Sequence, residues 1–113
     1  MWFRTRVGLV GVEEPVEIVI EQFTRENTKY WAILARGKCQ QEVTLKGVLG
    51  RGTFSNPVSY LAQFLDNPDA KQSIGSCMRL IASSVENEKK VCDLSQVGDA
   101  QAWSRQWNQV DWS

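Results

Sequence analysis

The sequence predicts an α+β fold: an antiparallel sheet of four to five strands, arranged as an N-terminal meander, with two or three helices packed on one face. Residues 2–49 alternate apolar and polar side chains, which is the period of half-buried strands. Residues 57–85 instead repeat apolar side chains at helical spacing, and only short polar turns separate the expected strands. Residues 1–113 are expected to form a single domain, since 42% apolar and 23% charged residues are typical of a folded chain.

The expected strands of the N-terminal half are bounded by polar or glycine-containing turns and cover residues 2–10, 16–23, 30–35 and 41–49. The alternation predicts that the first two form a hairpin whose paired residue numbers sum to an odd value near 25. This register places Val7 beside Ile18 on the buried face and Arg4 beside Glu21 outside. The strand over 30–35 is apolar on both faces, which favours a central position in the sheet.

The first expected helix begins at Asn56-Pro57, where an N-cap residue precedes a proline at the first helical position. Its apolar stripe continues to about Asp66, and Tyr60 and Phe64 widen the stripe. We therefore include Tyr60 and Phe64 among the candidate partner-binding residues.

The second expected helix repeats the same start signal at Asn67-Pro68. One face of it, at 100° per residue, is expected to carry six apolar residues: Ala70, Ile74, Cys77, Met78, Ile81 and Val85. Residues 78–94 also fit a hairpin, which stays open as the alternative, and residues 90–94 are a candidate fifth strand.

The C-terminal end holds three of the five tryptophans of the chain. A final helix over 99–110, capped by its first aspartate, places Trp103 and Trp107 on one stripe, which predicts that they pack against the sheet. Trp112 and Arg105 lie off that stripe. We expect both to contact another chain, because an exposed tryptophan is an effective interface anchor.

The composition favours a non-catalytic protein. Histidine is absent, which removes the usual general base and metal ligand and excludes Ser-His and Cys-His catalysis. No enzyme activity, cofactor or metal is expected. The sequence therefore predicts a protein–protein interaction module, a small adaptor, inhibitor or immunity-like protein of bacterial or phage type. The expected partner is another protein chain, including a second copy of itself as a homodimer.

The alternative is an anion or nucleic-acid binding domain that uses the loop Gly50-Arg51-Gly52-Thr53 and exposed aromatic residues. Glycines let backbone N–H groups converge, the following helix start favours an anion, and Arg51 can grip a phosphate. The spacing matches neither of the common phosphate-binding patterns, however. Thirteen basic residues balance thirteen acidic ones, so the zero net charge makes nucleic acid the less favoured partner.

The cysteines at 39, 77 and 92 are odd in number and form no CxxC pair, which is typical of a reducing compartment. Cys39 is expected to be a spectator thiol, Cys77 a packing residue and Cys92 half-buried. Neither a signal peptide nor a membrane span is recognised, so we expect a cytoplasmic protein with no membrane partner.

Overall fold

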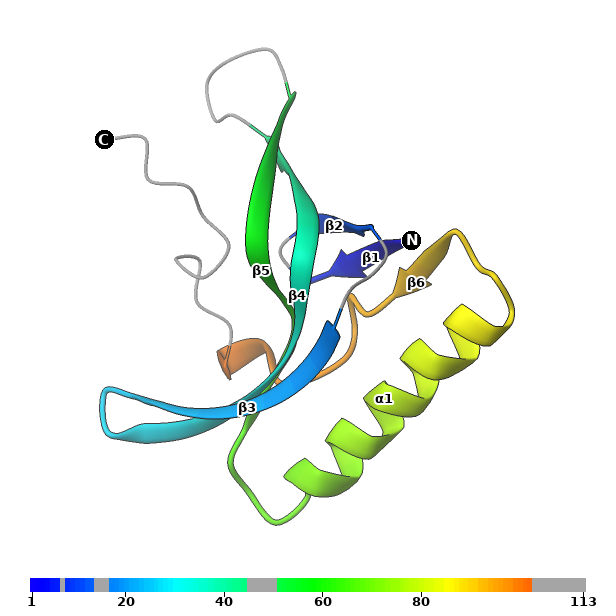
Figure 1. Ribbon diagram of the computed structural model, residues 1–113. Coiled ribbons are helices and arrows are strands. Elements are labelled where there is room, and N and C mark those ends of the chain that lie inside the picture. The colour runs from blue at the N-terminus through cyan, green and yellow to red at the C-terminus, as the bar shows by residue number, and fades with distance from the viewer. Residues whose placement is uncertain (7, 14–16, 45–50, 103–113) are drawn as a thin grey trace.

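The computed structural model describes residues 1–6, 8–13, 17–44 and 51–102 (Figure 1). These residues form six strands, one α-helix and a 3-10 turn. The strands are β1 (Trp2–Thr5), β2 (Gly8–Val12), β3 (Glu17–Arg25), β4 (Thr28–Thr44), β5 (Arg51–Leu65) and β6 (Val91–Asp93). The helix is α1 (Ala70–Glu86), and the 3-10 turn is η1 (Ala100–Ala102).

The six strands form two small sheets of three strands, β3–β4–β5 and β2–β1–β6. Pairing of β2 with β4 joins the two into one hydrogen-bonded network, and β1 with β6 is the parallel pair in it. Helix α1 runs along the side of the molecule that β6 borders (Figure 1). The expectation of four to five strands with two or three helices on one face is therefore wrong.

The N-terminal segment is a hairpin of its own, not one long strand. β1 pairs antiparallel with β2, with Trp2 opposite Gly11 and Thr5 opposite Gly8. The Thr5 hydroxyl donates to the carbonyl of Gly8 at 2.8 Å, and Gly8 has a φ of 150°, which favours glycine. The predicted pairing of residues 2–10 with 16–23 is wrong, because β3 pairs with β4 instead. Val7 lies outside the described residues.

A strand occupies the place of the first expected helix. β5 passes through Pro57, which falls in a register shift between the pairs Arg36–Val58 and Cys39–Asn56. Proline donates no backbone N–H, so an irregularity in the ladder accommodates it. Residues 59–64 are largely buried on both faces of the strand, so their apolar residues do not alternate with polar ones and resemble a helical stripe.

Strand β4 confirms the expected central position of residues 30–35. It pairs with β3 on one side and β5 on the other, and Ala32, Ile33 and Ala35 are fully buried. Gly37 does not end the strand as expected. It lies in the register shift of the β4–β5 ladder with a φ of 139°, so the ladder is irregular there but β4 continues to Thr44. Residues 45–49 lie outside the described residues.

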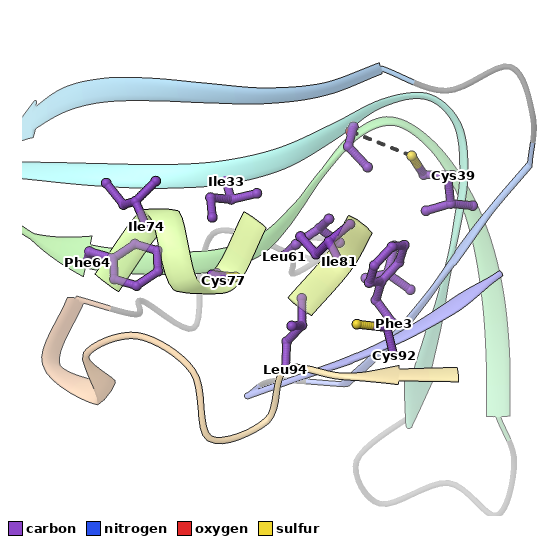
Figure 2. Packing of buried hydrophobic residues seen from close by; sticks show 14 of the residues in the cluster. Phe3, Ile33, Cys39, Leu61, Phe64, Ile74, Cys77, Ile81, Cys92 and Leu94 are labelled. Atoms are coloured by element: carbon purple, nitrogen blue, oxygen red, sulfur yellow. Dashed lines mark hydrogen bonds between the residues drawn. The ribbon is translucent and has the colours of Figure 1, made fainter. Parts of the chain in front are cut away.

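Helix α1 confirms the predicted stripe from Ala70 to Ile81 but not at Val85, and the hairpin alternative for residues 78–94 is wrong. Figure 2 shows Ile74, Cys77 and Ile81 in the core cluster between the two sheets. The N-cap is Asp69 instead of Asn67, whose side chain accepts the Asp69 N–H at 3.0 Å. The expected fifth strand is present as β6.

The segment after β6 is fastened to β5 by Asp99. Its carboxylate accepts the N–H of Leu65 at 2.9 Å, and its own N–H donates to the carbonyl of Gln63 at 3.0 Å. The guanidinium of Arg6 holds the preceding turn through the carbonyls of residues 96–98. The Asp99 side chain thus accepts a backbone N–H of β5, whereas the sequence predicted that it would cap a helix. Trp103 and Trp107, which were expected to pack against the sheet, lie outside the described residues.

Candidate functional site

An apolar pocket of about 540 Å³ lies where the beginnings of β1 and β3, the end of β2 and the last turn of α1 meet. We call it the N-terminal pocket. Its lining residues are Met1, Trp2, Phe3, Val12, Ile18, Ile81, Val85, Glu88, Lys89 and Lys90.

Core residues form the inner wall of the N-terminal pocket. Phe3, Val12 and Ile81 belong to the buried cluster that joins the two sheets to α1. Side chains fixed in a packed core keep their positions, so this wall is preformed. The pocket therefore offers a fixed apolar surface to a group that enters from solvent.

Backbone hydrogen bonds hold the first residues in place at the mouth of the pocket. The Met1 amino group donates to the carbonyl of Val12 at 3.1 Å, and the N–H of Val12 donates back to Met1 at 2.8 Å. On the opposite side, the Trp2 N–H donates to the carbonyl of Lys90 at 2.9 Å. The start of the chain is thus anchored to β2 and to the residue before β6.

Trp2 belongs to a row of paired residues that crosses the β2–β1–β6 sheet. Its register partners are Gly11 on β2 and Val91 on β6. The indole lies against the backbone of Gly11. Two of its ring carbons are only 2.9 Å from the position that a Cβ atom would occupy at residue 11. Trp2 keeps 37% of its surface exposed and Val91 keeps 44%.

Exposed apolar side chains gather around the N-terminal pocket. Five large hydrophobic residues are exposed among those that the structure describes; Trp2 and Val85 line the pocket, and Val91 is the neighbour of Trp2 on β6. Single exposed apolar residues are ordinary, whereas a group beside a pocket indicates a contact surface. We call the N-terminal pocket together with Trp2, Val85 and Val91 the apolar surface.

The charged side chains at the pocket are exposed. Glu88, Lys89 and Lys90 come from the turn between α1 and β6, where Glu88 has a φ of 50°. They form a polar rim around an apolar interior, which is the anatomy of a protein-binding site. The described residues that line the pocket can thus bind an apolar group, and no nucleophile stands among them beside a base.

The sequence-predicted partner residues do not reach the apolar surface within the described chain. Phe64 is only 1% exposed and belongs to the core, and Tyr60 is half-buried on β5 opposite Leu34. Arg105 and Trp112 lie outside the described residues.

The glycine-containing loop is described only from Arg51 onward, and Gly50 lies outside the described residues. Arg51, Gly52 and Thr53 begin β5 and pair with the end of β4. No helix follows them, so the helix N-terminus on which anion binding depended is replaced by a strand.

Sequence reasoning missed Trp2, Val85 and Val91. One signal was available: an aromatic residue, Trp2, is paired across the strands with a glycine, Gly11. This pairing can be recognised only once the β1–β2 hairpin is known. Val85 was assigned to the buried helix stripe, whereas the buried face of α1 passes through Ser84 and leaves Val85 53% exposed.

The three cysteines are free and buried, including Cys92, which was expected to be half-buried. Burial raises the pKa of the Cys39 thiol, although its Ser59 neighbour acts in the opposite direction. Burial and then the nearby Cys92 raise the pKa of Cys77 to about 12. The thiols of Cys39 and Cys77 are therefore protonated at neutral pH.

The described residues contain no group of three or more Cys, Asp or Glu side chains that could hold a metal ion. Within the same part of the chain, no helix has the length and apolar character needed to cross a membrane. Comparison with models of protein families, with curated proteins and with solved structures finds no match for this chain.

Proposed function

We propose that the protein is a non-catalytic protein-binding module that contacts its partner through the apolar surface. The observation that carries this proposal is the exposure of Trp2 and Val85 at one preformed pocket, with the exposed Val91 beside Trp2 in the sheet. Burying such side chains is favourable by about 25 cal/mol per Å² of apolar area. Tryptophan is also enriched among the residues that dominate binding energy at protein interfaces.

The polar rim supports a protein partner. A typical interface has an apolar centre and a charged margin, and Glu88, Lys89 and Lys90 supply that margin here. This margin carries both positive and negative side chains, and the net charge of the whole chain is zero. Its attraction to a polyanion such as nucleic acid is therefore weak. A small adaptor, inhibitor or immunity-like protein fits these features. Three buried free thiols suit a reducing cytoplasm.

The test compares two matched substitutions on α1. Val85→Ser removes an apolar side chain from the apolar surface, whereas Leu80→Ser removes one that is 39% exposed and does not line the N-terminal pocket. The immobilised full chain is incubated with extract from the cells that produce it, and bound proteins are quantified by mass spectrometry. We expect a partner that wild type and Leu80→Ser retain and that Val85→Ser and Trp2→Ala lose. Equal retention by all four proteins would exclude the apolar surface as the contact.

A further inference from the structure

Strand β3 lies at an open edge of its sheet. Among the described strands it pairs with β4 alone, and β4 pairs with β5 on its other side. An unpaired edge is a template for another chain, and proteins commonly shorten or interrupt such an edge to prevent pairing. β3 instead runs for nine residues and pairs with β4 in one register without a shift. The edge is therefore long and regular enough to accept a further strand.

The backbone groups on this edge belong to the even-numbered residues of β3. The turn Glu26-Asn27 has positive φ at both positions, and in a two-residue turn of this kind the flanking Arg25 and Thr28 exchange both backbone hydrogen bonds. Backbone groups alternate in direction along a strand, so the odd-numbered residues of β3 face β4. The carbonyl of Lys29 agrees with this assignment, because it accepts the N–H of Asp66, just after β5, at 3.1 Å. Four residues thus direct their N–H and C=O groups to the free edge: Ile18, Ile20, Gln22 and Thr24.

The even-numbered side chains of β3 continue the apolar surface towards this edge. Ile18 lines the N-terminal pocket, and Ile20 lies on the same face of the sheet because side chains alternate along a strand. Ile20 is 43% exposed, whereas its register partner Ile33 is fully buried, so the apolar row of this sheet ends at the edge partly uncovered. A strand added to β3 would place its own side chains beside Ile18 and Ile20 and cover them.

The odd-numbered side chains decide which charge such a strand must carry. Glu17 is exposed, and no ion pair joins it to any residue that the structure describes. Glu21 is also exposed, and its carboxylate accepts a hydrogen bond from the guanidinium of Arg36 on β4 at 2.6 Å. Opposite charges attract across neighbouring strands, whereas a further carboxylate would be repelled. The edge therefore favours a strand whose residues alternate between apolar and basic.

We propose that the partner inserts an extended segment of alternating apolar and basic residues, which adds to the free edge of β3 as a further strand. Backbone hydrogen bonds to the even-numbered residues supply affinity, and the side chains on the two faces supply selectivity, as in other cases of strand addition. Apolar side chains cover Ile18 and Ile20 beside the N-terminal pocket, and basic side chains face Glu17. This inference rests on the proposed function and names the part of the partner that binds there.

A second copy of β3 meets these conditions less well than a separate chain. In a two-fold antiparallel pair, the even-numbered residues of one copy pair with the even-numbered residues of the other, because only these direct backbone groups to the edge. Every such register that pairs Ile20 with a residue of β3 places Glu21 opposite a residue that is not basic: Glu17, Val19, Glu21 or Phe23. A partner of different sequence is free of this conflict.

The probe is a synthetic heptapeptide of alternating lysine and valine with blocked ends, titrated into the full chain. Amide hydrogen exchange followed by NMR reports the opening of each backbone hydrogen bond. The odd-numbered amides of β3 should exchange slowly with and without the peptide, since they already bond to β4. At saturating peptide, exchange should slow by at least about tenfold at the amides that face the edge: Ile18, Ile20, Gln22 and Thr24.

Two pairs of matched variants test the side-chain selection. Ile20→Lys replaces the apolar contact by a charge and should lower the affinity for the peptide about tenfold, whereas Leu80→Lys makes the same change at an exposed site on α1 and should bind like wild type. Glu17→Lys should weaken binding of the lysine–valine peptide and strengthen binding of a glutamate–valine peptide. Asp69→Lys changes the net charge equally at an exposed site outside β3, and in moderate salt it should alter neither affinity.

Saturating peptide that leaves the even-numbered amides unprotected would overturn the proposal, as would an absence of binding or equal affinity for the two peptides. Slow exchange of these amides in the free chain that is lost on dilution would assign the edge to a second copy and refute a separate partner. The exchange experiment uses wild type, so it decides the matter even if a variant fails to fold. If the peptide does not bind while Val85→Ser still loses its captured partner, strand addition is refuted and the protein-binding function is retained.

Discussion

The indole of Trp2 lies against the backbone of Gly11, its register partner, with no room for a Cβ atom between them. Glycine in a strand leaves a gap that a cross-strand aromatic ring can cover. The contact fixes the direction of the most prominent side chain of the apolar surface.

Gly11→Ala is expected to displace the Trp2 ring, because the new methyl group would stand 2.9 Å from ring carbons. The free energy of unfolding should change by less than about 1 kcal/mol, since a partly exposed side chain can move aside. The indole N–H resonance of Trp2 should shift, and partner retention should fall. In the Trp2→Ala background, Gly11→Ala should no longer affect retention; an equal effect in both backgrounds would show that the contact is irrelevant.

Gln63→Met is expected to leave stability unchanged or raise it by about 1–3 kcal/mol, because an unpaired buried amide costs that much. The Gln63 side chain is fully buried on β5, and neither its Oε1 nor its Nε2 has a hydrogen-bond partner among the residues that the structure describes. Urea unfolding measures the difference, with Gln72→Met on the exposed side of α1 as the control. A loss of stability in Gln63→Met alone would indicate that the amide does make a stabilising contact.

Asp99→Ala is expected to lower the free energy of unfolding by about 1–3 kcal/mol, because it leaves the Leu65 N–H without its acceptor. Asp99→Asn keeps an oxygen acceptor and should cost less. Asp69→Ala is the control, since the Asp69 side chain makes no cap hydrogen bond to α1. If the two alanine variants were equally stable in chemical unfolding, the Asp99 side chain would not be what holds the segment after β6 against β5.

Stability should fall at alkaline pH through the thiol of Cys77. Burial raises its pKa from 9.0 to about 12 in the folded protein, so the unfolded thiol ionises first. The contribution is complete below pH 9.0 and is lost as the pH rises towards 12. Urea unfolding at a series of pH values should show a shallower alkaline decline for Cys77→Ala than for wild type. Identical slopes would mean that this thiol does not titrate differently in the two states.

Helix α1 could be predicted because one buried face repeats at helical spacing from Ala70 to Ile81. The segment before it could not, because a strand buried on both faces has no alternation, and Pro57 suits a helix start and a ladder irregularity equally. The β1–β2 hairpin was hidden because its alternation continues through the turn. The apolar surface depends on both that hairpin and the parallel pairing of Trp2 with Val91, a contact between residues far apart in the sequence.

The most direct measurement of the central claim is photo-crosslinking from two positions on α1 in the cells that produce the protein. A benzophenone side chain replaces Val85 beside the N-terminal pocket in one variant and Leu80 in the other; both positions are exposed. We predict a covalent adduct with a partner chain from position 85 and none from position 80. Adducts of equal yield from both positions, or an adduct from position 80 alone, would contradict the assignment of the apolar surface as the binding site.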